Sequence, residues 1–201
     1  ELARNAPVHP IAHITCVGNS TVDVLDAVAD ALDSGTRTFL ALRGDPPADD
    51  LDWEPEAGGV GSAIELIHLI RTVEKRRCDY HPAEALRAAF APLTIAVAAF
   101  AAGNPAAGTS PLQEAERLLL KQAAGANFAI TQLFWEADTY LSFVERCRRL
   151  GVTIPIVPGI LPPTELARLR RVTELSGIEV PAHIIDTLSG AQDPESRHEL
   201  G

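Results

Sequence analysis

Methionine is absent from this sequence, and cysteine and aromatic residues are scarce. A run of 201 residues that begins at Glu1 without any methionine is unlike a complete translation product, so we expect part of the natural chain to be missing. The three cysteines form no Cys-x-x-Cys pair, which argues against a zinc cluster or a disulfide framework and favours a reducing, cytoplasmic setting. We expect each cysteine to be a packing residue: Cys16, Cys78 and Cys147.

Long apolar runs and basic clusters are missing as well. No apolar run approaches the ~20 residues of a transmembrane helix, and residues 1–5 lack the basic and apolar regions of a signal peptide. The net charge of −10 disfavours nucleic-acid binding, although a local pocket can still attract a small anion. The histidines show no metal-ligand spacing, and neither a Gly-x-Gly-x-x-Gly nor a P-loop motif occurs. We therefore expect no membrane, nucleic-acid or metal partner.

Apolar strand-like segments alternate with amphipathic helical segments, the pattern of a parallel sheet with crossover helices. This alternation predicts an α/β fold in a single domain, residues 1–201. The segment 46–61, rich in Pro, Gly and Asp, is equally consistent with a loop over a ligand site and with a plain connector. The predicted strands are 11–17, 38–42, 94–100, 128–133 and 155–160, and the predicted helices are 21–34, 62–77, 111–124, 137–150, 163–176 and 181–188.

The second predicted strand ends abruptly in polar residues, in the run Phe39-Leu-Ala-Leu-Arg-Gly-Asp-Pro-Pro47. In a parallel α/β protein the residues that follow buried strands converge at one edge of the sheet, where ligands bind. Arg43, Gly44 and Asp45 are therefore candidate site residues. In isolation the same three residues would be interpreted as a surface loop.

Four further segments, together with this motif, occur in the order and spacing that a known family shows. In order and spacing, residues 9–162 resemble the methylenetetrahydrofolate reductases. The resemblance implies a (β/α)8 TIM-barrel type of fold, with about five of the eight strands represented and the first two strands and the last one absent. Open sheet edges of this kind need more chain or a homo- or hetero-oligomeric partner. The segments that carry the resemblance, beside Arg43-Gly-Asp45, are His13-Ile-Thr-Cys16, Thr94-Ile-Ala-Val-Ala-Ala-Phe100, Phe128-Ala-Ile-Thr-Gln-Leu-Phe134 and Pro155-Ile-Val-Pro-Gly-Ile-Leu-Pro162.

The resemblance also assigns roles to individual residues. Asp45 and Gln132 are expected to act in catalysis and to bind the reduced folate, the carboxylate by stabilising positive charge and the amide by orienting the pterin or nicotinamide. The catalytic glutamate of the family lies on its first strand, so none is expected here, and Glu114 and Glu136 are candidates by position alone. The residues expected to bind the cofactor are His13, Thr15, Leu42, Arg43, Gly44, Asp45, Phe100 and Lys121.

Departures from the family pattern concentrate on the flavin site. The loop after the third strand reads Phe100-Ala-Ala-Gly-Asn-Pro105, where the family has a tyrosine, a glutamate and a histidine. The tyrosine that the family usually has before the next helix is replaced near Ser62. On the helix that faces the cofactor phosphate in the family, Arg117 and Leu120 stand where asparagine and arginine are usual. Each lost hydrogen bond weakens binding by about 1–3 kcal/mol. We therefore expect NAD(P)H as a cofactor and an eroded site for FAD.

The resemblance predicts a cytoplasmic oxidoreductase that reduces 5,10-methylenetetrahydrofolate to 5-methyltetrahydrofolate with NAD(P)H, with flavin weakly held or dispensed with. Two alternatives stay open. One is a non-catalytic folate-binding homologue or partner subunit, which the altered cofactor loop favours. The other is a barrel oxidoreductase with an unrelated substrate. Folate-dependent oxidation of NAD(P)H separates an enzyme from the first alternative, and a folate titration tests the second.

Overall fold

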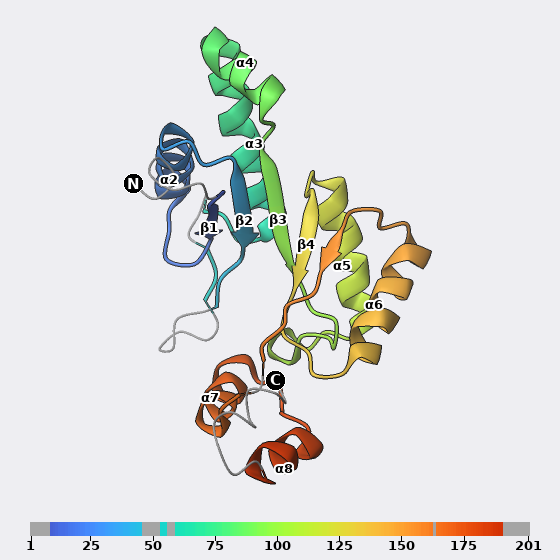
Figure 1. Cartoon of the computed structure of the whole chain (residues 1–201). Coiled ribbons are helices and arrows are strands. Elements are labelled where there is room, and N and C mark those ends of the chain that lie inside the picture. The colour runs from blue at the N-terminus through green and yellow to red at the C-terminus, as the bar shows by residue number, and fades with distance from the viewer. Residues whose placement is uncertain (1–8, 46–52, 56–58, 163, 191–201) are drawn as a thin grey trace.

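The fold is built on one parallel sheet. In this computed structural model the described residues are 9–45, 53–55, 59–162 and 164–190, and the structural statements below concern these residues. Five strands pair in the order β1-β2-β3-β4-β5, every neighbouring pair is parallel, and helices connect them (Figure 1). The predicted α/β class is confirmed. The strands are β1 (Ile11–Thr15), β2 (Thr38–Leu42), β3 (Thr94–Ala99), β4 (Phe128–Thr131) and β5 (Ile156–Val157).

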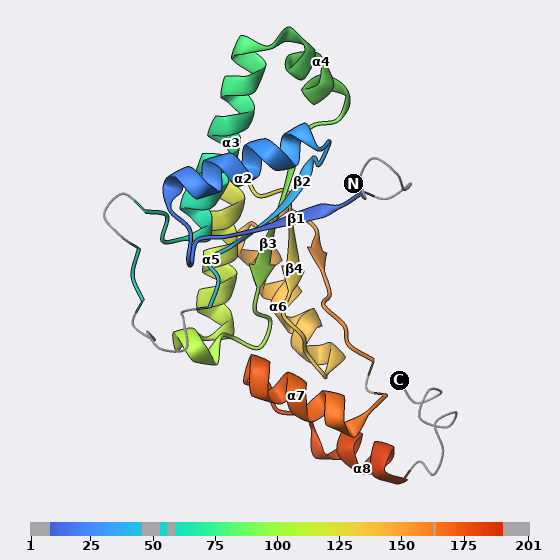
Figure 2. The same ribbon diagram turned by 90° about the vertical axis from the view of Figure 1, so that its left-hand side faces the viewer.

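Helices cover only one face of this sheet. In Figure 1 the helices α3 and α5 lie behind the strands and α2 and α6 flank them, and Figure 2 shows the same arrangement from the side. The face turned toward the viewer in Figure 1 carries no helix. The helices are α2 (Thr21–Asp33), α3 (Ala63–Tyr80), α4 (Pro82–Phe90), the 3-10 helix η1 (Pro105–Ala107), α5 (Pro111–Ala123), α6 (Ala137–Leu150), α7 (Leu166–Ser176) and α8 (Ala182–Gly190).

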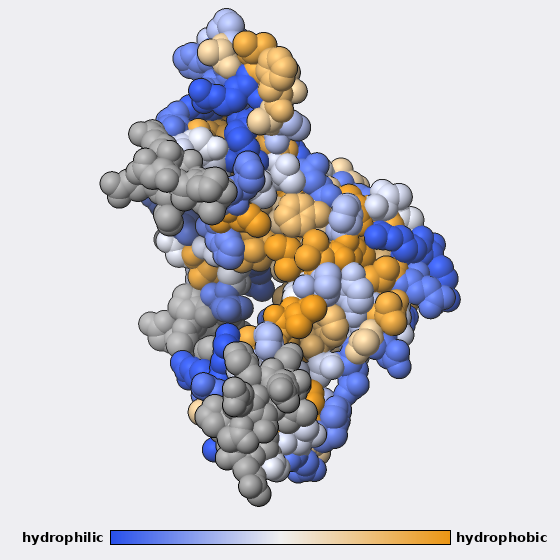
Figure 3. All heavy atoms as spheres, in the orientation of Figure 1, coloured by the Kyte–Doolittle hydropathy of each residue, from blue (hydrophilic) through white to orange (hydrophobic). Residues whose placement is uncertain are grey.

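The core forms between the sheet and these helices. Strand side chains alternate between the two faces, so Phe39 and Ala41 of β2 point toward the helices and are fully buried. They belong to one apolar cluster with residues of α2, α3, α5 and α6. The intervening residue, Leu40, lies on the open face and is not part of that cluster. Figure 3 shows apolar surface over the middle of the open face, and Ile11 and Val157 on the two edge strands are 41% and 43% exposed.

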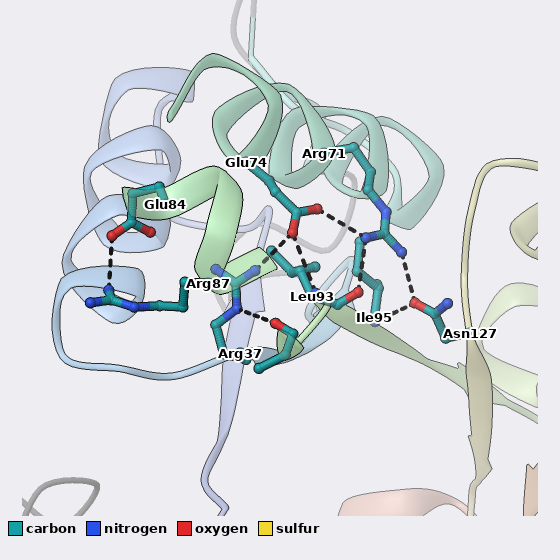
Figure 4. A network of polar contacts seen from close by, with 9 residues as sticks. Arg37, Arg71, Glu74, Glu84, Arg87, Leu93, Ile95 and Asn127 are labelled. Atoms are coloured by element: carbon teal, nitrogen blue, oxygen red, sulfur yellow. Dashed lines mark hydrogen bonds and ion pairs between the residues drawn. The ribbon is translucent and has the colours of Figure 1, made fainter. Parts of the chain in front are cut away.

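A polar network fixes the amino-terminal ends of the strands (Figure 4). Glu74 on α3 forms ion pairs with Arg37 before β2, at 3.0 Å, and with Arg71 one turn earlier, at 3.2 Å. The Arg71 guanidinium also donates to the carbonyl oxygens of Leu93 and Gly125 and to the side chain of Asn127. One helix thus holds the segments that lead into β2, β3 and β4, which sets the register of the sheet.

The structure differs from the predicted elements mainly at their ends. The strand β1 stops at Thr15 because the next two backbone N–H groups both donate to the Arg43 carbonyl oxygen. The strand β5 is limited to Ile156–Val157, since the prolines on either side cannot donate to a ladder. The helix α4 was not predicted, although its apolar residues have helical spacing, and the structure turns those residues to solvent. Most of the segment 46–61 lies outside the described residues.

Candidate active site

The candidate site lies at the carboxyl edge of the sheet, where the strands end together. Thr15 pairs with Leu42, and Ala99 pairs with Thr131, so the residues that follow these strands start from one edge. The alternation of each strand places several predicted site residues on the same open face, away from the helices. These residues are His13 and Thr15 of β1, Leu42 of β2 and Gln132 after β4.

The Arg43-Gly44-Asp45 turn is held tightly against the end of β1. The backbone N–H groups of Cys16 and Val17 both donate to the Arg43 carbonyl oxygen, each at 3.1 Å. Gly44 has a φ of +86°, and a Cβ atom there would lie 3.2 Å from Val17 Cβ, so this position requires glycine. The turn leaves Arg43 and Asp45 exposed at the edge. Arg43 Nη2 donates to the Trp53 carbonyl oxygen at 3.5 Å, and both side chains remain exposed to solvent.

Gln132 presents one free hydrogen-bonding group at this edge. Its backbone N–H donates to Ala99 at 2.7 Å, and its side-chain Oε1 accepts from its neighbour Leu133 at 2.9 Å. Because Oε1 is held by the backbone, the side chain has a fixed orientation. Its amide nitrogen Nε2 has no partner among the described residues, so it can donate to an acceptor on a bound molecule.

Thr131 connects the ends of β4 and β5, a role that the sequence analysis missed. Its buried hydroxyl oxygen accepts from the Gly159 N–H at 2.9 Å. A Cβ atom at Gly159 would lie 2.2 Å from the Thr131 carbonyl oxygen, so only glycine permits this approach. The sequence signal was a threonine at the end of an apolar strand, together with the Pro-Gly-Ile segment. This hydrogen bond holds Gly159, in the segment after β5, next to the backbone of Gln132.

Lys121 lies elsewhere, between α5 and the sheet. Its Nζ donates to the Ala98 carbonyl oxygen at 2.8 Å, and burial lowers the pKa of its ammonium group. The nearby carboxylate of Glu114 opposes this shift in pKa. Glu114 is itself only 2% exposed, accepts from the Thr109 hydroxyl at 2.5 Å and pairs with Arg117 at 3.0 Å. These groups fix the β3–α5 loop to α5.

The described residues do not fit a tightly held flavin. In the loop after β3, Phe100 is half-buried, Ala101 is buried, and the Asn104 side chain accepts from the backbone N–H of Ala107 in its own loop. Lys121, which the resemblance assigns to the cofactor, donates to the Ala98 carbonyl oxygen, and Arg117, which stands where the family has asparagine, pairs with Glu114. The loop and helix thus offer few free polar groups for a dinucleotide.

The titratable groups of the described residues outside this edge form no cluster of metal ligands. No group of three or more His, Cys, Asp and Glu residues in the described part of the chain could hold a metal ion. Glu136 is exposed at the start of α6, 3.6 Å from His183. Burial raises the pKa of the Cys16 thiol to about 11, so this cysteine is a poor nucleophile near neutral pH. No helix among residues 9–45, 53–55, 59–162 and 164–190 could cross a bilayer.

Fold and site together define the class of protein: an α/β chain of the barrel type, with candidate ligand-binding groups at the carboxyl edge of a parallel sheet. One solved structure, a phosphonopyruvate hydrolase, shares this fold with a TM-score of 0.52 and 16% sequence identity over 94% of this chain and 59% of its own. That likeness concerns the fold alone.

Sequence comparisons give the family. The family model described as methylenetetrahydrofolate reductase matches residues 1–201, so the chain belongs to the methylenetetrahydrofolate reductase family. A Caenorhabditis elegans protein named probable methylenetetrahydrofolate reductase (NADPH) is 35% identical over 90% of this chain. An Oryza sativa protein named probable methylenetetrahydrofolate reductase (NADH) is 34% identical over 94% of this chain. The chain spans 24% and 30%, respectively, of the lengths of these two relatives.

Proposed function

We propose that this chain carries the site of an oxidoreductase that reduces 5,10-methylenetetrahydrofolate to 5-methyltetrahydrofolate with NAD(P)H. The observation that carries the proposal is the match of the reductase family to the whole of residues 1–201. The geometry supports it, because Asp45 and Gln132 follow β2 and β4, two strands that lie about 10 Å apart in the sheet and end at the same edge. One bound molecule can therefore contact both.

The proposed chemistry needs positive charge to be stabilised and two rings to be aligned. Opening of the methylene bridge at N10, with a proton added there, leaves an iminium cation at N5. Hydride from the nicotinamide then adds to the methylene carbon and yields the N5-methyl group and NAD(P)+. The Asp45 carboxylate would stabilise the cation, and the Gln132 Nε2 would donate to a carbonyl of the pterin or the nicotinamide. None of the described residues is assigned as the donor of the proton to N10.

Direct transfer from NAD(P)H, with flavin weakly held or absent, is the form of the reaction that we propose. It is supported by the apolar loop after β3 and by the engagement of Lys121 and Arg117 with protein partners. His13, Thr15, Leu42, Arg43, Gly44 and Phe100 would then line the nicotinamide. The two relatives are named for NADPH and NADH, so both nucleotides belong in the assay.

The first experiment is an absorbance spectrum of the full-length protein, followed by NADH and NADPH oxidation with and without 5,10-methylenetetrahydrofolate. We expect a colourless protein that oxidises the nucleotide only when the folate is present. Flavin bands with folate-dependent oxidation would contradict the direct transfer and leave the reductase function standing. Binding of folate without any oxidation would contradict the enzyme and favour the non-catalytic folate-binding homologue.

Two variants test the assigned residues. Asp45→Asn is expected to lower kcat about 10- to 100-fold, because the charge that stabilises the cation is lost. Asp26→Asn, a matched change of an exposed carboxylate on α2, should leave kcat unchanged. Gln132→Ala is expected to raise KM for folate or nucleotide, because it removes the free amide. Wild-type constants for Asp45→Asn and Gln132→Ala would show that these two residues are not in the site.

A further inference from the structure

Glu114 is a buried carboxylate that the proposed chemistry does not use. It is only 2% exposed and lies on the same face of α5 as Ala115 and Leu118, which are fully buried. A buried charge costs folding free energy that an apolar residue at the same position would not cost. Its ion pair with Arg117 offsets this cost only in part, because the Arg117 side chain is 49% exposed and therefore screened by water. A carboxylate at this position needs a function that an apolar side chain could not perform.

The carboxylate holds the far end of the β3–α5 loop. The Thr109 hydroxyl donates to Glu114 Oε1 at 2.5 Å, and Thr109 exchanges two backbone hydrogen bonds with Asn104, at 2.9 and 3.0 Å. The loop is closed so tightly that a Cβ atom at Gly103 would lie 2.6 Å from the Thr109 carbonyl oxygen. The Gly103 N–H donates to the Phe100 carbonyl oxygen at 3.1 Å. Hydrogen bonds thus follow the loop from Glu114 back to the first residue after β3.

The same face of α5 also holds the near end of this loop. Lys121 follows Glu114 by about two helical turns, and its Nζ donates to the carbonyl oxygen of Ala98 on β3 at 2.8 Å. The charge of Glu114 supports this contact, because it raises the pKa of Lys121, which burial and the nearby Arg117 lower. Figure 1 shows the loop beyond the carboxyl end of β3, where it leads into α5. One face of α5 therefore fixes the loop at both ends, at Ala98 and at Thr109.

Gln132 is attached to the end of β3 that this loop follows. The residue after Ala98 is Ala99, whose carbonyl oxygen accepts from the backbone N–H of Gln132 at 2.7 Å. The Gln132 Oε1 is held by the backbone N–H of Leu133. The direction of the free Nε2 therefore depends on where the backbone of Gln132 lies. A shift of the Ala99 carbonyl oxygen would move the amide that the proposed function assigns to the ligand.

We propose that Glu114 is a positioning residue for Gln132. By fixing the β3–α5 loop to α5, it sets the place of the Ala99 carbonyl oxygen to which Gln132 is hydrogen-bonded. The inference rests on the proposed function, in which the Gln132 amide contacts the ligand. Because Glu114 acts through Gln132, its loss weakens ligand binding more than it slows the chemical step.

The test uses Thr109→Val and Glu114→Gln in the full-length protein. Thr109→Val removes only the hydroxyl, whereas Thr109→Ser keeps it, and the matched control Glu116→Gln changes an exposed carboxylate on the same helix. We expect Thr109→Val and Glu114→Gln to raise the KM that depends on Gln132 about 3- to 10-fold and to leave kcat within about twofold, since a hydrogen bond to a charged group is lost or weakened. Thr109→Ser and Glu116→Gln should keep the wild-type KM.

A double-mutant cycle shows whether the effect passes through Gln132. If Thr109 acts through Gln132, adding Thr109→Val to Gln132→Ala leaves the KM of Gln132→Ala unchanged. If Thr109→Val raises KM by the same factor with and without Gln132→Ala, the two residues act independently and the proposal is overturned.

Hydrogen exchange of the Gln132 backbone N–H gives a second readout, which requires no activity. We expect faster exchange in Thr109→Val and Glu114→Gln than in the wild type and Glu116→Gln. The N–H of Thr94, at the other end of β3, should exchange as in the wild type, which separates a local shift from general loss of stability. Equal exchange at Gln132 in all four proteins would overturn the proposal. Absence of folate-dependent NAD(P)H oxidation would instead overturn the proposed function, and the exchange rates would still decide whether Glu114 positions Gln132.

Discussion

Glu74→Gln is the change that most directly tests how the sheet is held. The Glu74 side chain is 16% exposed and contacts two arginines, Arg37 at 3.0 Å and Arg71 at 3.2 Å, and its Oε1 accepts from the backbone N–H of Leu93 at 3.3 Å. Neutralising it leaves two largely buried guanidinium groups close together without a counter-charge. Breaking a buried pair costs about 3–5 kcal/mol, and the partial exposure of Arg71 reduces this to about 2–4 kcal/mol.

The control for Glu74→Gln is Glu84→Gln on α4. The Glu84 side chain is equally buried, at 15% exposure, but its only described ion pair is with Arg87, which is 52% exposed. We expect this change to lower the free energy of unfolding by less than about 1 kcal/mol. The two glutamates are equally buried but differ in their ion-pair partners. Comparing the two variants therefore separates the contribution of the network from the general effect of neutralising a carboxylate.

Urea denaturation and thermal unfolding measure both variants. For a chain of this length a loss of about 3 kcal/mol lowers Tm by about 6–12 °C. The network also joins α3 to the segments before β3 and β4 through Arg71, so we expect Glu74→Gln to weaken hydrogen-exchange protection in those strands. If Glu74→Gln and Glu84→Gln lower stability equally, the network does not hold the sheet and the reasoning is refuted.

Three further predictions concern single groups. Gly44→Ala is expected to lower the free energy of unfolding by about 1–3 kcal/mol because of its φ of +86°, and an unchanged urea midpoint would contradict this. Tyr140→Phe removes a 2.7 Å hydrogen bond to the Ile156 carbonyl oxygen and should cost about 1–2 kcal/mol, whereas Tyr80→Phe at an exposed position should cost nothing measurable. Burial raises the pKa of Cys16 from 9.0 to about 11, so its stabilising contribution is complete below pH 9 and declines as the pH rises from 9 to 11. Urea unfolding of the wild type and Cys16→Ala between pH 8 and 11 checks this, and parallel curves would contradict it.

Local signals in the sequence were enough to predict most of the elements. The strand β2 and the helix α6 have the bounds that their apolar periodicity predicts, because the pattern is uninterrupted and Gly151 ends the helix in a left-handed conformation. The helices α2 and α5 each begin at a serine that accepts from a backbone N–H three residues later. Such signals act within a few residues, so the sequence displays them directly.

The candidate site was only partly predictable. The motif Arg43-Gly44-Asp45 could be located from the end of an apolar strand, and Gln132 from its resemblance to a family motif. Two contacts could not be predicted, because they depend on how the backbones approach each other. These are the hydrogen bond from the Leu133 N–H to Gln132 Oε1 and the hydrogen bond from the Gly159 N–H to Thr131. The assignment of Lys121 to the cofactor stays a prediction, and its contact with Ala98 came only from packing.

The sequence by itself determined the α/β class, the order of the strands along the chain, the family and the residues that stand at the strand ends. Tertiary structure alone decided which side chains remain free to bind a ligand and which are occupied, as Glu114 and Lys121 are. It also decided that α4 presents its apolar stripe outward, since its sequence fits burial equally well. The physical reason is that periodicity and capping are short-range properties of the chain. Burial and hydrogen-bond pairing between distant segments exist only once the segments have packed.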